Sequence, residues 1–263
     1  MFKRLLTDSI AIVFGNLETV FKTCGAWFAL QFVLSLIVLM IGGDISGEAE
    51  VGNLSGTGIL LILISAVVAL AASASIAVAW HRFGLLGEQP ATFHLRLGPL
   101  ELQFVWKLIQ LFFISMLVLI PVMIVVSLLG MALPPVVGTL LAAGLMLFWI
   151  MPHLVRLNLA LPAVAIERPM GIMEAHRLGN GLGWRMLWSL IVLSLPFLLV
   201  CMGLQYVLAL AGASLPVVLI QIKVLVLNVL LQIIVTVLGI SVITAGYRIA
   251  TEQPETADKP ELN

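Results

Sequence analysis

Residues 217–245 read VVLIQIKVLVLNVLLQIIVTVLGISVITA, an unbroken apolar stretch in which Lys223 is the one charged residue. A helix needs about 20 mostly apolar residues to cross the hydrocarbon core of a bilayer, so this stretch is long enough to span a membrane. Backbone polar groups have no water to pair with in lipid, which restricts such a segment to the α-helical form. The stretch therefore predicts a transmembrane helix.

Five further stretches have the same character, at about residues 23–42, 57–80, 108–129, 137–154 and 186–210. The connections at 43–56, 130–136 and 211–216 are short, so the sequence predicts three helical hairpins. Hydrophobic residues make up 62% of the chain and charged residues 10%, whereas soluble domains are about 45–50% apolar and about 25% charged. We expect an all-α, polytopic membrane bundle of six helices in one domain (residues 1–250), followed by a flexible cytoplasmic tail (251–263). The composition excludes an ordinary soluble domain and a disordered chain.

The placement of basic residues predicts the orientation in the membrane. Twelve of the 13 Lys and Arg residues fall on one side: Lys3, Arg4, Lys22, Arg82, Arg96, Lys107, Arg156, Arg168, Arg177, Arg185, Arg248 and Lys259. The opposite connections carry Asp44, Glu48 and Glu50. Positively charged short loops stay in the cytoplasm, so we expect a multi-pass membrane protein with both termini cytoplasmic. The net charge of zero gives no reason to expect a nucleic acid partner.

Similar motifs precede each odd-numbered stretch and suggest an internal repeat. A glycine turn and an aromatic-basic pair occur at Gly15 with Phe21-Lys22, at Gly98 with Trp106-Lys107, and at Gly179 with Trp184-Arg185. We expect three units, at about 2–82, 88–156 and 167–248, each opened by an amphipathic helix at the cytoplasmic interface: Phe2–Phe14, Pro90–Leu97 and Pro169–Leu178. Glu88-Gln89-Pro90 and Glu167-Arg168-Pro169 are interpreted as helix starts. The alternative is that any helical hairpin protein has basic-aromatic ends and glycine caps.

Residues 156–169 read RLNLALPAVAIERP and are followed by Gly179-Asn180 and Trp184-Arg185. This pattern resembles bacterial six-helix inner-membrane proteins, namely the YciC-like proteins and the membrane domain fused to glycerophosphodiester phosphodiesterases. The resemblance covers the third unit best and the first unit faintly. It implies a six-helix fold in the bacterial inner (plasma) membrane. It brings no catalytic residues, because the activity of the fused proteins would lie in their soluble domain.

Polar residues on one face of the last stretch form the first candidate site. Gln221, Asn228 and Gln232 share a helical face, and Gln205 and Tyr206 lie at a comparable depth in the preceding stretch. One hypothesis is a ligand pocket in which Lys223 is the cation for an anionic lipid headgroup. The alternative is a polar seam that joins helices, with Lys223 snorkelling to the interface.

The second candidate set consists of arginines predicted to contact headgroups: Arg82, Arg96, Arg156, Arg177, Arg185 and Arg248. None of His81, His94, His153 and His176 has a second ligand of suitable type at i+3 or i+4, so we expect neither a metal site nor a cofactor. Ser73 and Ser75 lie among alanines, where helix packing is favoured over an active serine. No set of residues meets the requirements of an active site, and we expect no catalysis.

Three functions remain open from the sequence. The first is a non-enzymatic, lipid-interacting or lipid-handling membrane protein, with membrane lipids as partners. The second is an accessory or assembly subunit with a protein partner in a larger membrane complex, for which the small-residue stripe Ser65, Ala69, Ser73 and Ala77 provides a docking face. The third is a small-solute transporter, which requires a cavity that reaches Lys223.

Overall fold

The computed structural model describes residues 1–42, 56–91, 94–211 and 217–257, and these contain helices and connecting turns without a strand. The helices are α1 (Phe2–Phe14), α2 (Leu17–Gly42), α3 (Gly56–Leu86), α4 (Pro99–Ala132), α5 (Pro135–Leu145), a π-helical segment (Met146–Ile150), α6 (Met151–Leu157), α7 (Ala160–Ala165), α8 (Ile172–Leu178), α9 (Gly183–Ala211) and α10 (Val217–Ala257). Six helical segments are long and apolar enough to cross a membrane. The predicted all-α membrane fold is confirmed, and the chain is a multi-pass membrane protein.

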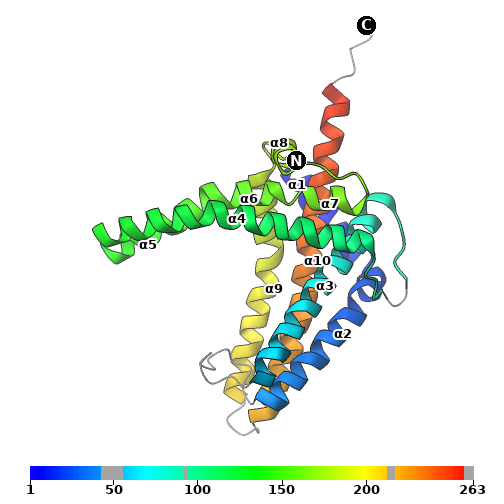
Figure 1. Ribbon diagram of the computed structural model, residues 1–263, viewed down its shortest axis with the longest axis vertical. Helices are drawn as coiled ribbons and strands as arrows, with labels where there is room; N and C mark the ends of the chain where they lie inside the picture. Colours follow the sequence, from blue (N-terminus) through cyan, green and yellow to red (C-terminus); the bar gives the residue numbers. More distant parts are fainter. Residues whose placement is uncertain (43–55, 92–93, 212–216, 258–263) are drawn as a thin grey trace.

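Four long helices form the body of the molecule. α2, α3, α9 and α10 run alongside one another, and α10 contacts α1, α2, α3 and α9 (Figure 1). α1, α7, α8 and the last turns of α10 all lie at one end of this bundle, which we call the rim (Figure 1). The two ends of the described chain therefore lie at the same end of the bundle.

Buried hydrogen bonds join α3 to α10 near the rim. Trp80 Nε1 donates to the hydroxyl of Ser241 at 2.7 Å, and His81 Nδ1 lies 2.8 Å from the hydroxyl oxygen of Thr244. Both hydroxyls donate their own proton to a carbonyl one turn earlier in α10, so the α3 rings must be the donors. All four side chains are buried, and the pairing removes the cost of leaving polar groups unpaired in an apolar interior.

The next turn of α3 approaches α10 still more closely. Arg248 of α10 donates to the carbonyl of Gly84. A Cβ atom on Gly84 would lie 2.7 Å from Cγ2 of Thr244. Glycine at this position therefore allows the two helices to reach hydrogen-bonding distance.

The middle hairpin does not join the bundle as the prediction of three hairpins suggested. α4 and α5 project sideways at the rim (Figure 1), and α4 contacts α3, α5 and α7. The most apolar part of α4 is 6% buried, against 22–28% for α2, α3, α9 and α10. Helices associate in lipid through small and polar residues. The buried face of α3 has Ala72, Ala74 and Ser75, whereas α4 exposes large side chains such as Phe112 and Leu117.

The predicted interfacial helices are found in part. α1 has the predicted bounds and packs against α9 and α10, with Leu5, Ser9 and Val13 buried. The third begins only at Ile172, as α8. The prediction of a helix at 90–97 is wrong, because the described residues of that segment form a non-helical connection. Its residues Leu95 and Leu97 are exposed, and a short helix without a packed apolar face is not stable. The three units are thus not equivalent.

The chain ends also differ from expectation. α10 continues to Ala257, so residues 251–257 are helical where a flexible tail was predicted. Lys259 and the acidic residues Asp44, Glu48 and Glu50 lie outside the described residues. Pro121 and Pro196 lie inside α4 and α9, and both helices continue through them.

We expect Gly84→Ala to weaken the contact between α3 and α10. The added methyl group has to displace Thr244, whose hydroxyl is fixed by two hydrogen bonds, and overpacking of this kind costs about 1–3 kcal/mol. Thermal unfolding in detergent measures the loss. Gly203→Ala is the matched control, because a Cβ atom there meets open space; an equal loss in both variants would contradict the role of Gly84.

Candidate functional site

A cavity of about 880 Å³ opens at the rim, between the end of α3, the connection to α4 and the residues that follow α7. Its volume is in the range of about 300–1,000 Å³ that is typical of ligand sites. The charged and titratable side chains that line it are Arg82, Glu88, His94, Arg96, Glu101 and Glu167. We call it the rim cavity.

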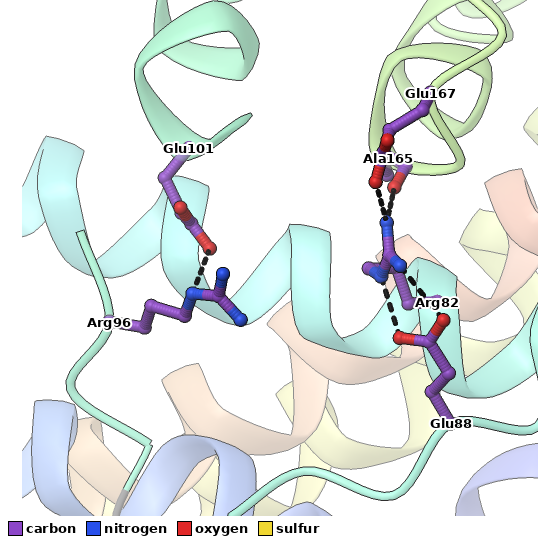
Figure 2. Close-up of polar contacts among 6 residues, drawn as sticks. All are labelled: Arg82, Glu88, Arg96, Glu101, Ala165 and Glu167. Carbon is purple, nitrogen blue, oxygen red and sulfur yellow. Dashed lines mark hydrogen bonds and ion pairs between the residues drawn. The ribbon is translucent and has the colours of Figure 1, made fainter. Parts of the chain in front are cut away.

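Arg82, near the end of α3, holds two carboxylates in place. Its Nε and Nη2 donate to the two oxygens of Glu88 at 2.7 and 2.8 Å. Its Nη1 donates to Glu167 Oε1 at 2.8 Å and to the carbonyl of Ala165 at 3.1 Å (Figure 2). Four of the five N–H donors of the Arg82 guanidinium are thereby used. Its hydrogen bonds to Glu88 are the main reason why the pKa of that carboxyl lies below its usual range, and the charge of Arg96 adds to the effect.

Glu167 adopts a backbone conformation that is unusual for its residue type. Its φ is 60°, in the left-handed region that glycine normally occupies at the end of a helix. The following N–H, of Arg168, donates to the carbonyl of Ala163 at 2.8 Å and closes α7. A non-glycine residue held in this region costs of order 1–3 kcal/mol and persists only where the surroundings require it. Here the bend directs a carboxylate at Arg82.

Arg96 and Glu101 form a looser pair, separate from the Arg82 group (Figure 2). Arg96 Nε lies 3.9 Å from Glu101 Oε1, and the side chain of Arg96 is 73% exposed. Glu101 is buried and accepts the backbone N–H of Gly98 at 2.7 Å, which caps the start of α4. Glu101 thus has a structural role as a helix cap, and Arg96 remains the accessible cation of the rim cavity.

His94 adds a polar group that is not used within the described protein. Its Nε2 atom is buried and has no hydrogen-bond partner among the described atoms. Burial is the main reason why the pKa of His94 lies below its usual range. The charge of Glu101 and a backbone hydrogen bond of Ser75 oppose the shift, and the charge of Arg96 adds to it. The imidazole is therefore neutral near pH 7, with Nε2 free to donate or accept depending on the tautomer.

An apolar groove of about 460 Å³ adjoins the rim cavity between α3 and α4. Its apolar walls come from Val67, Leu70, Ala71, Leu102 and Val105. Pro99 and Glu101 line both the groove and the rim cavity. A polar space and an apolar space therefore meet at the start of α4.

The structure brings two of the six predicted arginines, Arg82 and Arg96, into the rim cavity. The other four lie elsewhere: Arg156 packs against Gly179 and Gly183 with its Nε buried, Arg177 is exposed, Arg185 donates to the sulfur of Met1, and Arg248 bonds to Gly84. Their predicted contacts with headgroups stay predictions.

The predicted polar seam is connected at one point. Gln205 Nε2 donates to Asn228 Oδ1 at 2.9 Å and links α9 to α10. Lys223, Tyr206 and Gln232 are exposed, and Gln221 is half-buried. Lys223 lines neither the rim cavity nor the adjoining groove.

His153 and His176 were considered one at a time from the sequence, and their meeting was not predicted. His153 Nδ1 and His176 Nε2 lie 3.1 Å apart with stacked rings, although they are far apart in the chain. No group of three or more His, Cys, Asp or Glu residues that could hold a metal occurs in the described part of the chain.

Glu88 and Glu167 were interpreted from the sequence as helix starts, and it was not predicted that both bind Arg82. Their shared Glu-x-Pro pattern was the available signal that the two glutamates have a common role.

No family model matches this chain, and no curated protein or solved structure matches it either. The resemblance of residues 156–169 to the YciC-like proteins stays a prediction.

We expect Arg82→Met to raise the pKa of Glu88 toward its usual value of about 4.3, because the variant loses the hydrogen bonds that favour the carboxylate. In the native protein this pairing stabilises the fold above the pKa of the unfolded chain, and the stabilisation is lost as the pH falls. Carbon-13 NMR of labelled glutamate carboxyls in nanodiscs measures the pKa. Arg177→Met, at an exposed arginine outside the cavity, is the control. An unchanged Glu88 titration in Arg82→Met would contradict the pairing.

Proposed function

We propose that this protein binds a phospholipid at the rim, with the headgroup in the rim cavity and an acyl chain in the groove between α3 and α4. The observation that supports this most strongly is that the polar cavity and the apolar groove share Pro99 and Glu101. A phospholipid has the same division, a charged head joined to an apolar chain. We propose that the protein is non-enzymatic and that its role is to bind or handle lipid.

The position of the site is consistent with this role. The rim cavity lies at one end of the spanning helices, where headgroups are found, and cations near that surface each attract anionic groups by about 1 kcal/mol. We propose that the rim faces the cytoplasm of a bacterium, because basic residues favour that side. Both described ends of the chain lie there (Figure 1).

The side chains in the cavity favour binding over catalysis. Its described lining includes no serine, threonine, cysteine or lysine, which are the usual nucleophiles. The carboxylates are engaged by arginine or by a helix cap. Such groups hold a headgroup in one orientation.

An accessory subunit of a membrane complex is the second candidate, and one observation favours it. The middle hairpin, α4 and α5, is little buried and exposes large side chains that include Phe112, Phe113 and Leu117. These exposed side chains could pack against an apolar helix of a partner protein as well as against lipid. Mass spectrometry of the protein extracted in native-lipid nanodiscs distinguishes the two, because a subunit retains a protein at fixed stoichiometry.

We expect Leu70→Trp to reduce the amount of phospholipid that co-purifies with the protein. Leu70 lines the apolar groove, and an indole ring fills the space that an acyl chain would occupy. Leu63→Trp is the matched control, since Leu63 lies two turns away on the same face of α3, is exposed, and is outside the groove. Native mass spectrometry counts the retained lipids. Equal retention of phospholipid in the two variants would contradict the proposed site.

We expect Lys223→Leu to leave both membrane insertion and lipid retention unchanged. Lys223 is exposed and lies outside the rim cavity and the groove, near the opposite end of α10. The same native mass spectra measure the effect. A large loss of lipid in this variant would contradict the proposed site. It would support instead the predicted pocket around Lys223 and the transporter hypothesis.

A further inference from the structure

We infer that the rim cavity selects a headgroup with both a phosphate and a primary ammonium, as in phosphatidylethanolamine. This inference rests on the proposed function, because it names the lipid class for the same site. It follows from the charge balance of the cavity and from which of its arginines and carboxylates already pair with one another.

The cavity does not have the charge balance of an anion site. Two arginines, Arg82 and Arg96, face three carboxylates, Glu88, Glu101 and Glu167. An anionic lipid without a cationic group would bring a phosphate close to surplus negative charge, and like charges at close range repel. A ligand with one anionic and one cationic group matches both signs.

The accessible groups divide into one phosphate site and one ammonium site. Arg82 already uses four of its five N–H donors on protein oxygens, and the buried carboxylate of Glu101 caps α4, so both are largely engaged within the protein. Arg96 is the exposed cation, at 73% side-chain exposure. His94 lines the same cavity, and its buried Nε2 has no hydrogen-bond partner among the described atoms. Arg96 provides donors for a phosphate, and His94 adds one when Nε2 carries the proton.

The carboxylates on the opposite side provide the ammonium site. Glu167 is 68% and Glu88 49% exposed at the side chain, and Arg82 fixes the orientation of both (Figure 2). An ionised carboxylate accepts several hydrogen bonds, so each has capacity left beyond the bonds from Arg82. A primary ammonium has three N–H donors to use it.

The chemistry of other common headgroups fits less well. A choline headgroup has no N–H donor, and proteins bind it through the rings of Trp, Tyr and Phe, of which the described lining of the cavity has none. A glycerol headgroup leaves the phosphate charge without a cation to face Glu88 and Glu167. A serine headgroup adds a carboxylate beside these two.

The test uses the wild-type chain in nanodiscs with equal amounts of phosphatidylethanolamine, its N-monomethyl and N,N-dimethyl derivatives, phosphatidylcholine and phosphatidylglycerol. Native mass spectrometry after gentle release reports which lipids stay bound. We expect phosphatidylethanolamine to be enriched the most, with a stepwise fall as each methyl group removes a donor. Because this series changes the lipid and not the protein, it does not depend on the folding of a variant.

Two variants then assign the two halves of the site. We expect Glu167→Gln to lower the enrichment of phosphatidylethanolamine over phosphatidylcholine about tenfold, the effect of one hydrogen bond between charged groups. We expect Arg96→Gln to lower retention of all the phospholipids alike. Glu18→Gln is the control, because Glu18 pairs with Lys22 on α2, outside the cavity.

Equal retention of phosphatidylethanolamine and phosphatidylcholine, or preferential retention of phosphatidylglycerol, would overturn the headgroup inference and leave the proposed function standing. Retention of no phospholipid above its share of the nanodisc would overturn both.

Discussion

The buried hydroxyls of Ser241 and Thr244 hold α3 against α10, and the rim is built on this contact. Each hydroxyl donates its proton within α10 and accepts one from α3. A polar group left unpaired there would carry a desolvation cost of about 1–3 kcal/mol, so the register between the two helices is fixed. Arg82 comes directly after His81 in α3, so the same contact sets the depth and direction of its side chain.

Most of the fold could be predicted from the sequence because hydropathy and length decide which segments cross a membrane. The six apolar helices and α1 were found in this way. The packing of the middle hairpin was not, because it depends on which faces have small and polar residues rather than on mean hydropathy. The helix predicted at 90–97 failed for a related reason, since the pattern suggested a short amphipathic helix but no partner surface covers Leu95 or Leu97.

The candidate site was harder to predict, because it depends on contacts between distant parts of the chain. Arg82 and Arg96 were predicted as candidate site residues because they are basic and lie between two membrane-spanning segments. The two Glu-x-Pro motifs were visible as a repeat, and the structure shows that both glutamates meet on Arg82. The sequence has no signal for that convergence, nor for the stacking of His153 on His176. The polar residues around Lys223 formed a clear pattern on the helix, yet only Gln205 and Asn228 are joined among the described contacts of that set.

The central claim is that a phospholipid occupies the rim cavity and the adjoining groove. The most direct test is an electron cryo-microscopy map of the protein in native-lipid nanodiscs, with an antibody fragment bound to increase its size. The account predicts headgroup density between Arg96 and Glu167, continuous with a chain that runs past Leu70. A map of equal quality in which this space holds no lipid, while ordered lipid is resolved elsewhere on the surface, would contradict it.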